Sequence, residues 1–173
     1  MPVRTILIHP ESGLRKVSSE ITKLSDKLLT LADDMLETMY EAPGIGLAAP
    51  QIGSPVRLIV IDCNTEDENI RSPIQMFNPK IIELSDEKNL HEEGCLSIPN
   101  QFGEVERPSA VSVQWINRDG NEECKTFEGL WATCIQHEID HLDGKLFIDY
   151  LSPLRRQLIT RKMKKFKREN LLK

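Results

Sequence analysis

Two histidines one helical turn apart are the strongest chemical signal in the sequence, in the segment His137-Glu138-Ile139-Asp140-His141. Four residues advance an α-helix by about 400°, so both imidazoles lie on one face and can bind one metal ion. Glu138 follows the first histidine, where its carboxylate can reach water at the metal without being a ligand itself. The pattern predicts a catalytic metal site.

Such a site needs a third protein ligand and an open position. His9 and His91 are candidates, as are several acids, and Cys95 lies in the segment EGCLS, where a glycine lets the backbone approach the metal closely. Cys134 faces a similar side of the predicted helix, but it precedes His141 by roughly 10 Å along the axis, which makes it the weaker candidate. The four cysteines have no paired short spacing, so we expect mostly reduced, buried thiols.

A third segment, GIGLAAPQ from Gly44 to Gln51, is rich in small residues. Residues without bulky side chains let a substrate backbone lie against the chain, and the Gln51 amide offers donors of the type that stabilise an oxyanion. The segment is not a phosphate loop, because no Gly-Lys-Ser/Thr follows it.

Hydrophobic periodicity predicts three helices around these segments. Apolar residues between Ser25 and Tyr40 recur at helical spacing, which indicates an amphipathic helix capped by Ser25. Residues 129–142 have the spacing of a largely apolar, buried helix that carries the two histidines. A last helix is predicted from Ser152 onward, because Ser152 can cap it and Pro153 suits its first turn.

The middle of the chain has strand composition. Strands are predicted over 56–61, 75–84 and 105–116, with Asp119-Gly120 turning the chain so that 111–116 pairs with 122–127. Residues 41–53 are predicted to be loop or irregular edge, and 64–72 an exposed loop. The order of elements predicts an α+β fold in which antiparallel sheet packs around a central helix, in a single domain over residues 1–173.

The composition is that of a soluble globular domain. The chain has 173 residues, 39% hydrophobic and 28% charged, which excludes collagenous, disordered and membrane classes. No apolar run approaches the ~18 residues of a membrane helix, and residues 1–10 hold too short an apolar run for a signal peptide, so we expect a cytoplasmic protein without membrane contact. The net charge of −5 is uneven, with +8 over residues 152–173 and −13 over the rest.

Together the three segments resemble the peptide deformylase family, which removes the formyl group from the initiating methionine of new proteins. The motifs that carry the resemblance are GIGLAAPQ at 44–51, EGCLS at 93–97 and QHEIDHLDG at 136–144, in the expected order. The resemblance extends from Ile6 to Leu154 and leaves the basic tail least covered. Three independent matches are far more specific than any one of them.

The resemblance implies a role for each candidate metal-site residue. Cys95, His137 and His141 would hold the metal, and Glu138 would be the general acid and base. The family typically uses ferrous iron, with Zn2+, Ni2+ or Co2+ able to occupy the site. The residues alone indicate a mixed sulfur and nitrogen site without choosing among these metals.

The resemblance also implies how the substrate, a formyl-methionyl nascent peptide, would bind. The Gln51 amide and the Leu96 backbone N–H would bind the oxyanion formed when water attacks the formyl carbon. Hydrolysis would release formate and a free N-terminal methionine. Backbone contacts to the peptide and the walls of the methionine pocket would come from Ile45, Gly46, Gly94, Leu130, Thr133 and Cys134. Thr133 is more polar than the aliphatic residue often found there.

Two other functions compete with this interpretation. His-Glu-x-x-His also marks zinc proteases that cleave internal peptide bonds, although a cysteine ligand and the following Leu142-Asp143-Gly144 fit a deformylase better. A structural metal site in a nucleic-acid-binding module would need a fourth ligand, and none stands out. Outside the motifs, Glu93 and Arg107 are candidates for an ion pair, with Asp140 a further candidate partner of Arg107.

The basic tail has two interpretations. Ile159, Met163 and Phe166 fall at helical spacing among lysines and arginines, which fits a docked helix with a solvated charged face. The alternative is contact with the ribosome near the peptide exit, which the resemblance implies for bacterial relatives. We expect a monomer.

Overall fold

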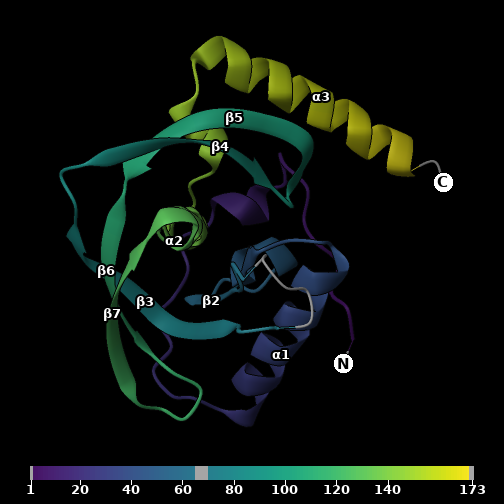
Figure 1. Ribbon diagram of the computed structural model, residues 1–173. Helices are drawn as coiled ribbons and strands as arrows, with labels where there is room; N and C mark the ends of the chain where they lie inside the picture. The colour runs from purple at the N-terminus through teal and green to yellow at the C-terminus, as the bar shows by residue number, and fades with distance from the viewer. Residues whose placement is uncertain (1, 65–69, 172–173) are drawn as a thin grey trace.

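The computed structural model describes residues 2–64 and 70–171. Helix α2 (Gly129–Leu142) lies in the middle of the molecule, with strands around one side, α1 (Asp26–Glu41) below and α3 (Pro153–Leu171) across the top (Figure 1). The fold is α+β with antiparallel sheets around a central helix, as predicted.

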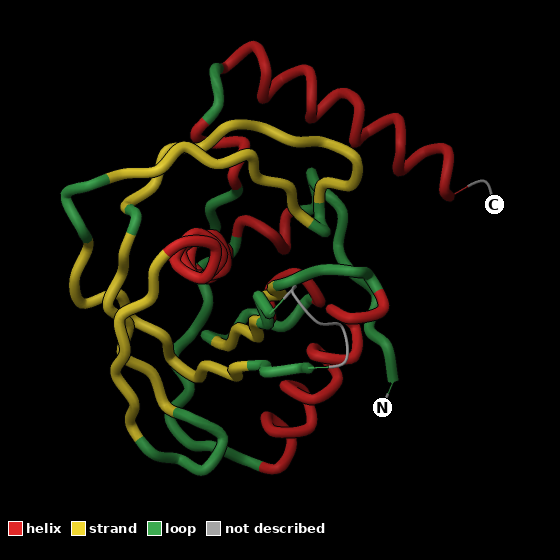
Figure 2. The backbone as a smooth tube through the Cα atoms, in the orientation of Figure 1, coloured by secondary structure: helices red, strands yellow, loops and turns green. Residues whose placement is uncertain are grey.

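A five-stranded antiparallel sheet covers one side of α2, as Figure 2 shows. Its strands, in spatial order, are β1 (Gly46–Ala48), β2 (Leu58–Ile61), β3 (Ile74–Leu84), β6 (Ala110–Ile116) and β7 (Glu122–Glu128). The predicted strands over 56–61 and 75–84 and the hairpin at Asp119-Gly120 are confirmed, with Ile116 paired to Glu122. Buried side chains of this sheet form one core with Ile135, Ile139 and Leu142 of α2.

A separate two-stranded hairpin, β4 (Lys88–Cys95) and β5 (Ile98–Pro108), delivers Cys95 to the end of β4. The prediction of one strand over 105–116 is wrong, because the chain changes sheets at Ser109: β5 pairs with β4, and β6 pairs with β3. Pro108, which has no N–H, ends β5 at this point. Strand β4 was not predicted, because residues 88–92 are all exposed and lack the alternation of a half-buried strand.

The segment 41–53 is more regular than predicted. Gly46–Ala48 form β1, which pairs with β2 from Gly46↔Ile61 to Ala48↔Ile59, and residues 49–52 form a short 3-10 helix. The prediction of a loop is wrong for these residues, because three fully buried residues are too few to produce a periodic pattern. The other alternative, an irregular edge, fits β1, which is the edge strand of the sheet. Of the predicted exposed loop 64–72, residues 65–69 lie outside the described residues, and 70–72 are exposed.

The predicted helix caps are present. Ser25 accepts a hydrogen bond from the Leu28 N–H at 3.4 Å, and Ser152 accepts one from the Arg155 N–H at 3.3 Å. Each cap gives one of the otherwise unpaired N–H groups of a first helical turn a partner. The boundaries of α1, α2 and α3 therefore follow the sequence closely.

Helix α3 is docked on the molecule through one face. Ile159 and Met163 are buried in a cluster that includes Leu14, Ile98 and Phe147. The helix is also tied to the N-terminal segment, since the Thr160 hydroxyl lies 2.8 Å from His9 Nε2 and Lys167 pairs with Glu11 at 3.0 Å. This confirms the predicted docked helix with a charged outer face.

Two further sequence expectations concern thiols and membrane spans. All four cysteines are free thiols, as expected, but the expected burial holds only for Cys63 and Cys134, since Cys95 is partly exposed and Cys124 is exposed. Across residues 2–64 and 70–171, no helix has the length and apolar character needed to cross a membrane.

Candidate active site

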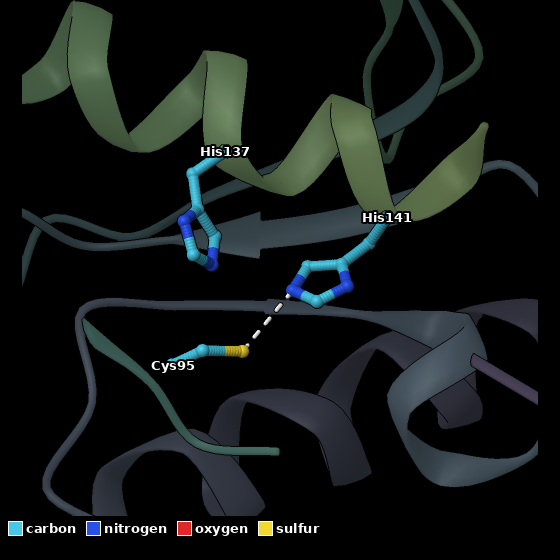
Figure 3. Close-up of side chains that lie close together, drawn as sticks. All are labelled: Cys95, His137 and His141. Carbon is cyan, nitrogen blue, oxygen red and sulfur yellow. Dashed lines mark hydrogen bonds between the residues drawn. The ribbon is translucent and has the colours of Figure 1, made fainter. Parts of the chain in front are cut away.

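Three potential metal ligands meet between α2 and the end of β4. The Cys95 sulfur and one ring nitrogen each of His137 and His141 lie within 4.8 Å of one another. Figure 3 shows both imidazoles projecting from one face of α2 toward the Cys95 thiol, and Cys95 Sγ lies 3.3 Å from His141 Nε2. The i, i+4 spacing on a helix and the end of a hairpin thus bring together residues that lie more than 40 positions apart.

This donor set fits a divalent transition metal. One thiolate and two imidazoles form a mixed sulfur and nitrogen site, and three protein ligands leave a position open for water or substrate. The other ligand candidates lie elsewhere: His9 contacts Thr160, His91 is exposed, and the Cys134 thiol faces the Ile45 carbonyl at 3.7 Å. Of the candidates, only Cys95 joins the two histidines in this cluster.

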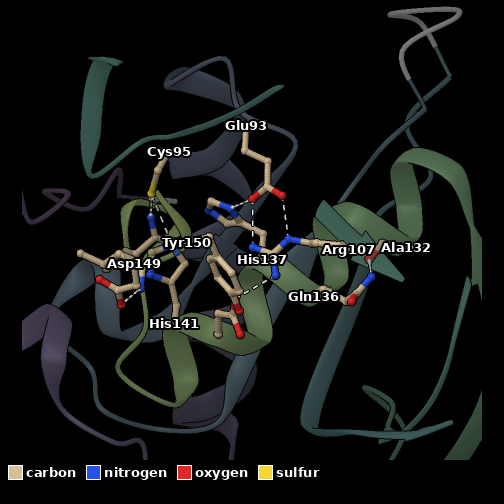
Figure 4. A network of polar contacts seen from close by, with 12 residues as sticks. Glu93, Cys95, Arg107, Ala132, Gln136, His137, His141, Asp149 and Tyr150 are labelled. Carbon is tan, nitrogen blue, oxygen red and sulfur yellow. Dashed lines mark hydrogen bonds and ion pairs between the residues drawn. The ribbon is translucent and has the colours of Figure 1, made fainter. Parts of the chain in front are cut away.

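A buried ion-pair network holds His137 in place (Figure 4). His137 Nδ1 lies 2.9 Å from Glu93 Oε1, which leaves its Nε2 facing the cluster. Arg107 donates two hydrogen bonds to Glu93, at 2.6 and 3.0 Å, and one to Asp140 at 2.9 Å. The Tyr150 hydroxyl donates to the same Asp140 oxygen at 2.7 Å. The predicted pairing of Glu93, Arg107 and Asp140 is confirmed.

Charges in this network stabilise one another. Burial raises the pKa of Glu93, but hydrogen bonds from His137 and Arg107 outweigh it and hold the pKa below its usual value. Burial lowers the pKa of His137, but contacts with Cys95 and Glu93 outweigh it and raise the pKa. The negative surroundings that favour a proton on His137 also favour a divalent cation beside it, because metal and proton compete for the same nitrogen.

The carboxyl group of Glu138 is buried beside the metal-ligand cluster. Its side chain is 4% exposed, and burial raises its pKa to about 7. The Oε2 atom is buried without a hydrogen-bond partner among the described residues. A carboxyl group of this pKa can both accept and donate a proton near neutral pH.

Gly46 of β1 lies against Glu138. A Cβ atom at this position would lie 2.5 Å from Glu138 Oε1 and 2.8 Å from the Cys134 sulfur, so only glycine fits. The absence of a side chain thereby lets β1 approach α2 closely enough to form one wall of the site.

The Gln51 amide reaches the same place from the 3-10 helix that follows β1. It is 1% exposed, accepts a hydrogen bond from the Ala48 N–H at 2.9 Å, and donates one to Ser97 Oγ at 3.1 Å. Its Nε2 also lies 3.5 Å from Cys95 Sγ. One amide N–H is therefore held by Ser97, and the other points toward Cys95 in the metal-ligand cluster.

A cavity of about 710 Å³ opens onto these groups. The candidate substrate residues all line it: Ile45, Gly46, Gly94, Leu130, Thr133 and Cys134. So do Gln51, Cys95, Leu96, His137 and Glu138, whereas His141 does not. The cavity is large enough for an extended peptide segment, and its walls are mostly apolar.

Sequence reasoning missed several residues of the site. Ser97 lies inside the EGCLS motif, but no role was predicted for it. Its position two residues after the predicted metal ligand Cys95 is the signal that could have indicated one. Phe102 lines the cavity, and its ring packs where a Gly94 side chain would lie. Only the pairing of Gly94 with Phe102 across the hairpin brings them together, and β4 was not predicted.

Comparisons with known proteins agree on one family. Residues 3–157 match the model of the family described as polypeptide deformylase. The chain is 52% identical over 171 residues to a peptide deformylase of Bartonella tribocorum (98% of this chain, 96% of the relative). It is 50% identical over 165 residues to one of Rhizobium meliloti (95% and 94%). The crystal structure of peptide deformylase from Ehrlichia chaffeensis in complex with actinonin superposes with a TM-score of 0.93 at 40% identity, covering 97% of this chain and 99% of that one.

Proposed function

The chain belongs to the polypeptide deformylase family, and we propose that its helix α2, strand β1 and hairpin β4–β5 supply the groups that carry out the family's reaction. The protein is a hydrolase that removes the N-terminal formyl group of formyl-methionine, releasing formate. The observation that supports this assignment of residues is the cluster of Cys95, His137 and His141 next to the buried carboxylate of Glu138, whose Oε2 has no hydrogen-bond partner within residues 2–64 and 70–171.

Cys95, His137 and His141 hold the metal ion in this proposal. When bound, a divalent metal supplies Lewis acidity that polarises the formyl oxygen and makes water acidic enough to attack at neutral pH. We infer Fe2+ as the ion from membership of the family, with Zn2+, Ni2+ or Co2+ able to replace it, since the thiolate and imidazole donors suit all four metals. Glu93 keeps the His137 ring oriented by accepting a hydrogen bond from its Nδ1–H.

Glu138 moves the proton. Its carboxylate takes a proton from the attacking water and then gives it to the nitrogen of the breaking C–N bond, which leaves as the free amine of methionine. The raised pKa, caused by burial, supports both steps, since the group changes protonation state near neutral pH. Formate and an unblocked N-terminus result.

Gln51 and the backbone N–H of Leu96 stabilise the oxyanion of the tetrahedral intermediate. The Gln51 amide nitrogen lies beside the cluster, and Leu96 lines the cavity. Among the turn and loop hydrogen bonds of residues 2–64 and 70–171, none uses the Leu96 N–H, which supports its availability as a donor. Removing one donor of this kind typically costs about 2.7 to 4 kcal/mol of transition-state stabilisation.

The methionine side chain lies in the apolar part of the cavity. The helical face of Leu130, Thr133 and Cys134 lines it, together with the neighbouring Ile45 and Gly46. Gly94 offers backbone groups to the peptide. Burial of a methionine side chain contributes only about 1.5 to 3 kcal/mol, so selection for methionine is graded rather than absolute.

The cellular setting is part of the proposal. The substrate is the N-terminus of a nascent chain, so we place the protein in the cytoplasm, as a monomer, with the basic face of α3 contacting the ribosome. The exposed lysines and arginines of this helix support the contact, because ribosomal RNA is anionic. Residues 1–173 act as one catalytic domain, supported by the burial of Ile159 and Met163 in the molecule.

The experiment is formate release from a formyl-Met tripeptide by anaerobically purified, iron-loaded protein. The same peptide with an acetyl group is the matched control, because the extra methyl makes the acyl carbon less accessible. We expect rapid release of formate, far slower release of acetate, and loss of both in Cys95→Ala. A verified metal-loaded sample that releases no formate would reject the assignment, and internal peptide cleavage would then be assayed.

A further inference from the structure

The orientation of the Gln51 side chain is fixed at both ends of its amide group. Oε1 accepts a hydrogen bond from the Ala48 N–H at 2.9 Å, and Nε2 donates one to Ser97 Oγ at 3.1 Å. A backbone N–H can only donate, so Ala48 selects the oxygen and excludes the flipped amide. The nitrogen thereby also donates a hydrogen bond to Cys95 Sγ at 3.5 Å, at the place where the substrate oxygen would arrive beside the metal ligands.

The Ser97 hydroxyl oxygen accepts a hydrogen bond from one of the two N–H groups on Gln51 Nε2. The two N–H bonds of a planar amide diverge, so when one hydrogen is held by Ser97 Oγ, the other points toward the metal-ligand cluster. Without the hydroxyl, the first hydrogen would lack its acceptor in a buried site, and rotation of the side chain would be less restricted. Ser97 thus determines where the remaining donor of Gln51 points.

Backbone hydrogen bonds from the N-terminal segment hold Ser97 and Gln51 in place. Ser97 is 0% exposed, and its carbonyl accepts a hydrogen bond from the His9 N–H at 2.9 Å. The Gln51 carbonyl accepts one from the Leu7 N–H at 2.7 Å. One short N-terminal segment therefore holds the backbones of both residues, which come from different parts of the chain.

We propose that Ser97 is a positioning residue for deformylation, which acts by holding the Gln51 amide so that its second N–H meets the oxyanion of the tetrahedral intermediate. This inference rests on the role proposed above for Gln51. An N–H that is already oriented stabilises developing charge without reorganising during the reaction, so the effect of Ser97 falls on the chemical step.

A double-mutant cycle tests the proposal with the iron-loaded protein and a formyl-Met tripeptide. Ser97→Ala should lower kcat by about tenfold and change KM by less than about twofold, because the contact it supports strengthens in the transition state. Gln51→Ala should lower kcat by about 10² to 10³-fold. In the Gln51→Ala background, Ser97→Ala should have no further effect on kcat, since the amide that it positions is gone.

Two further variants keep the test decisive. Ser97→Cys nearly preserves the shape of the side chain but offers a weak sulfur acceptor, so the same cycle can be run if the alanine variant does not fold. Thr38→Ala is the matched control: this buried hydroxyl on α1 donates to the Asp34 carbonyl and accepts from the Arg4 N–H, so its loss should lower Tm and leave kcat unchanged.

Equal losses of kcat for the Ser97 variants with and without Gln51 would overturn the inference, as would an effect confined to KM. Unchanged kcat in the Ser97 variants, while wild-type protein releases formate and Gln51→Ala does not, would overturn it and leave the deformylase assignment standing. Full activity of Gln51→Ala would overturn the role of Gln51 and this inference together.

Discussion

The carboxylate of Glu93 contacts two groups that the site needs, the His137 ring and the Arg107 guanidinium. Both partners are buried, and Glu93 accepts two of the three side-chain hydrogen bonds that Arg107 donates to Glu93 and Asp140. At the scale of the residue, the proposed metal ligand His137 therefore depends on the ion pair between Glu93 and Arg107. A buried charge that loses its partner is far more costly than an exposed one.

Glu93→Gln should weaken metal binding by about 10 to 100-fold, because the neutral amide oxygen replaces the charged acceptor that orients His137 and makes its ring a stronger ligand. It should also lower the free energy of unfolding by about 3 kcal/mol, because Arg107 is left with Asp140 alone as its charged partner. Competition with a chelator and urea unfolding measure the two effects. Glu106→Gln on the same hairpin is the control, since its pair with Lys88 is exposed and should contribute about 0.5 kcal/mol or less. Equal behaviour of the two variants would contradict the role of Glu93.

At the scale of the element, the three helices and the strands with strong patterns could be predicted from the sequence. The spacing of His137 and His141 even predicted which face of α2 carries the site. Strands β1 and β4 could not be predicted, because one is three residues long and the other is mostly exposed and charged. Both strands lie at the cavity. Because they were not predicted, the contacts of Gly46 with Glu138 and of Phe102 with Gly94 could not be predicted either.

Because β1 packs closely against α2 at Gly46, adding one methyl group at this position should strongly affect activity and stability. Gly46→Ala should lower kcat at least about tenfold and the free energy of unfolding by about 1 to 3 kcal/mol, because the new Cβ would lie 2.5 Å from Glu138 Oε1. Gly103→Ala is the control, since its Cβ would meet the movable Leu151 side chain at 2.7 Å, outside the cavity. It should lower Tm and keep kcat. Full activity of Gly46→Ala would show that β1 does not constrain Glu138.

The contact of α3 with the N-terminal segment predicts a pH dependence of stability. Burial, aided by the nearby positive charge of Arg15, lowers the pKa of His9 to about 4. The unfolded chain binds a proton below its pKa of about 6.5 while the folded protein does not, so this contribution to stability falls as pH drops from 6.5 toward 4.

Between pH 7.5 and 5, wild-type protein should lose about 2 kcal/mol more unfolding free energy than His9→Gln, which has no titrating ring. Urea unfolding at the two pH values gives both numbers, and deformylase activity at pH 7.5 confirms that the variant is folded. The same pH dependence in both proteins would mean that His9 titrates normally in the folded state.

At the scale of the whole molecule, charge is separated along the chain, with +8 over residues 152–173 and −13 over the rest. The positive end is a helix whose buried side holds Ile159 and Met163, so truncation would remove part of the core as well as the charge. Substitution of exposed lysines and arginines is therefore the cleaner way to test contact with the ribosome.

Replacing Arg161, Lys162 and Lys164 by glutamine should weaken co-sedimentation with ribosomes and reduce its salt dependence, while turnover of a short formyl peptide stays unchanged. The control replaces the equally exposed Lys23, Lys27 and Lys80 on other faces and should leave co-sedimentation as in the wild type. Co-sedimentation that is unaffected by the α3 substitutions would show that this face of α3 does not contact the ribosome.

The most direct test of the central claim is the metal content and formate release of Glu138→Gln, measured on the same sample. Glu138 is proposed to carry protons without binding the metal, so the variant should hold one metal ion per chain, as the wild type does. Its formate release should fall by at least about 10²-fold, because the amide cannot accept a proton from water. A variant that releases formate at nearly the wild-type rate, or that loses the metal, would contradict the account.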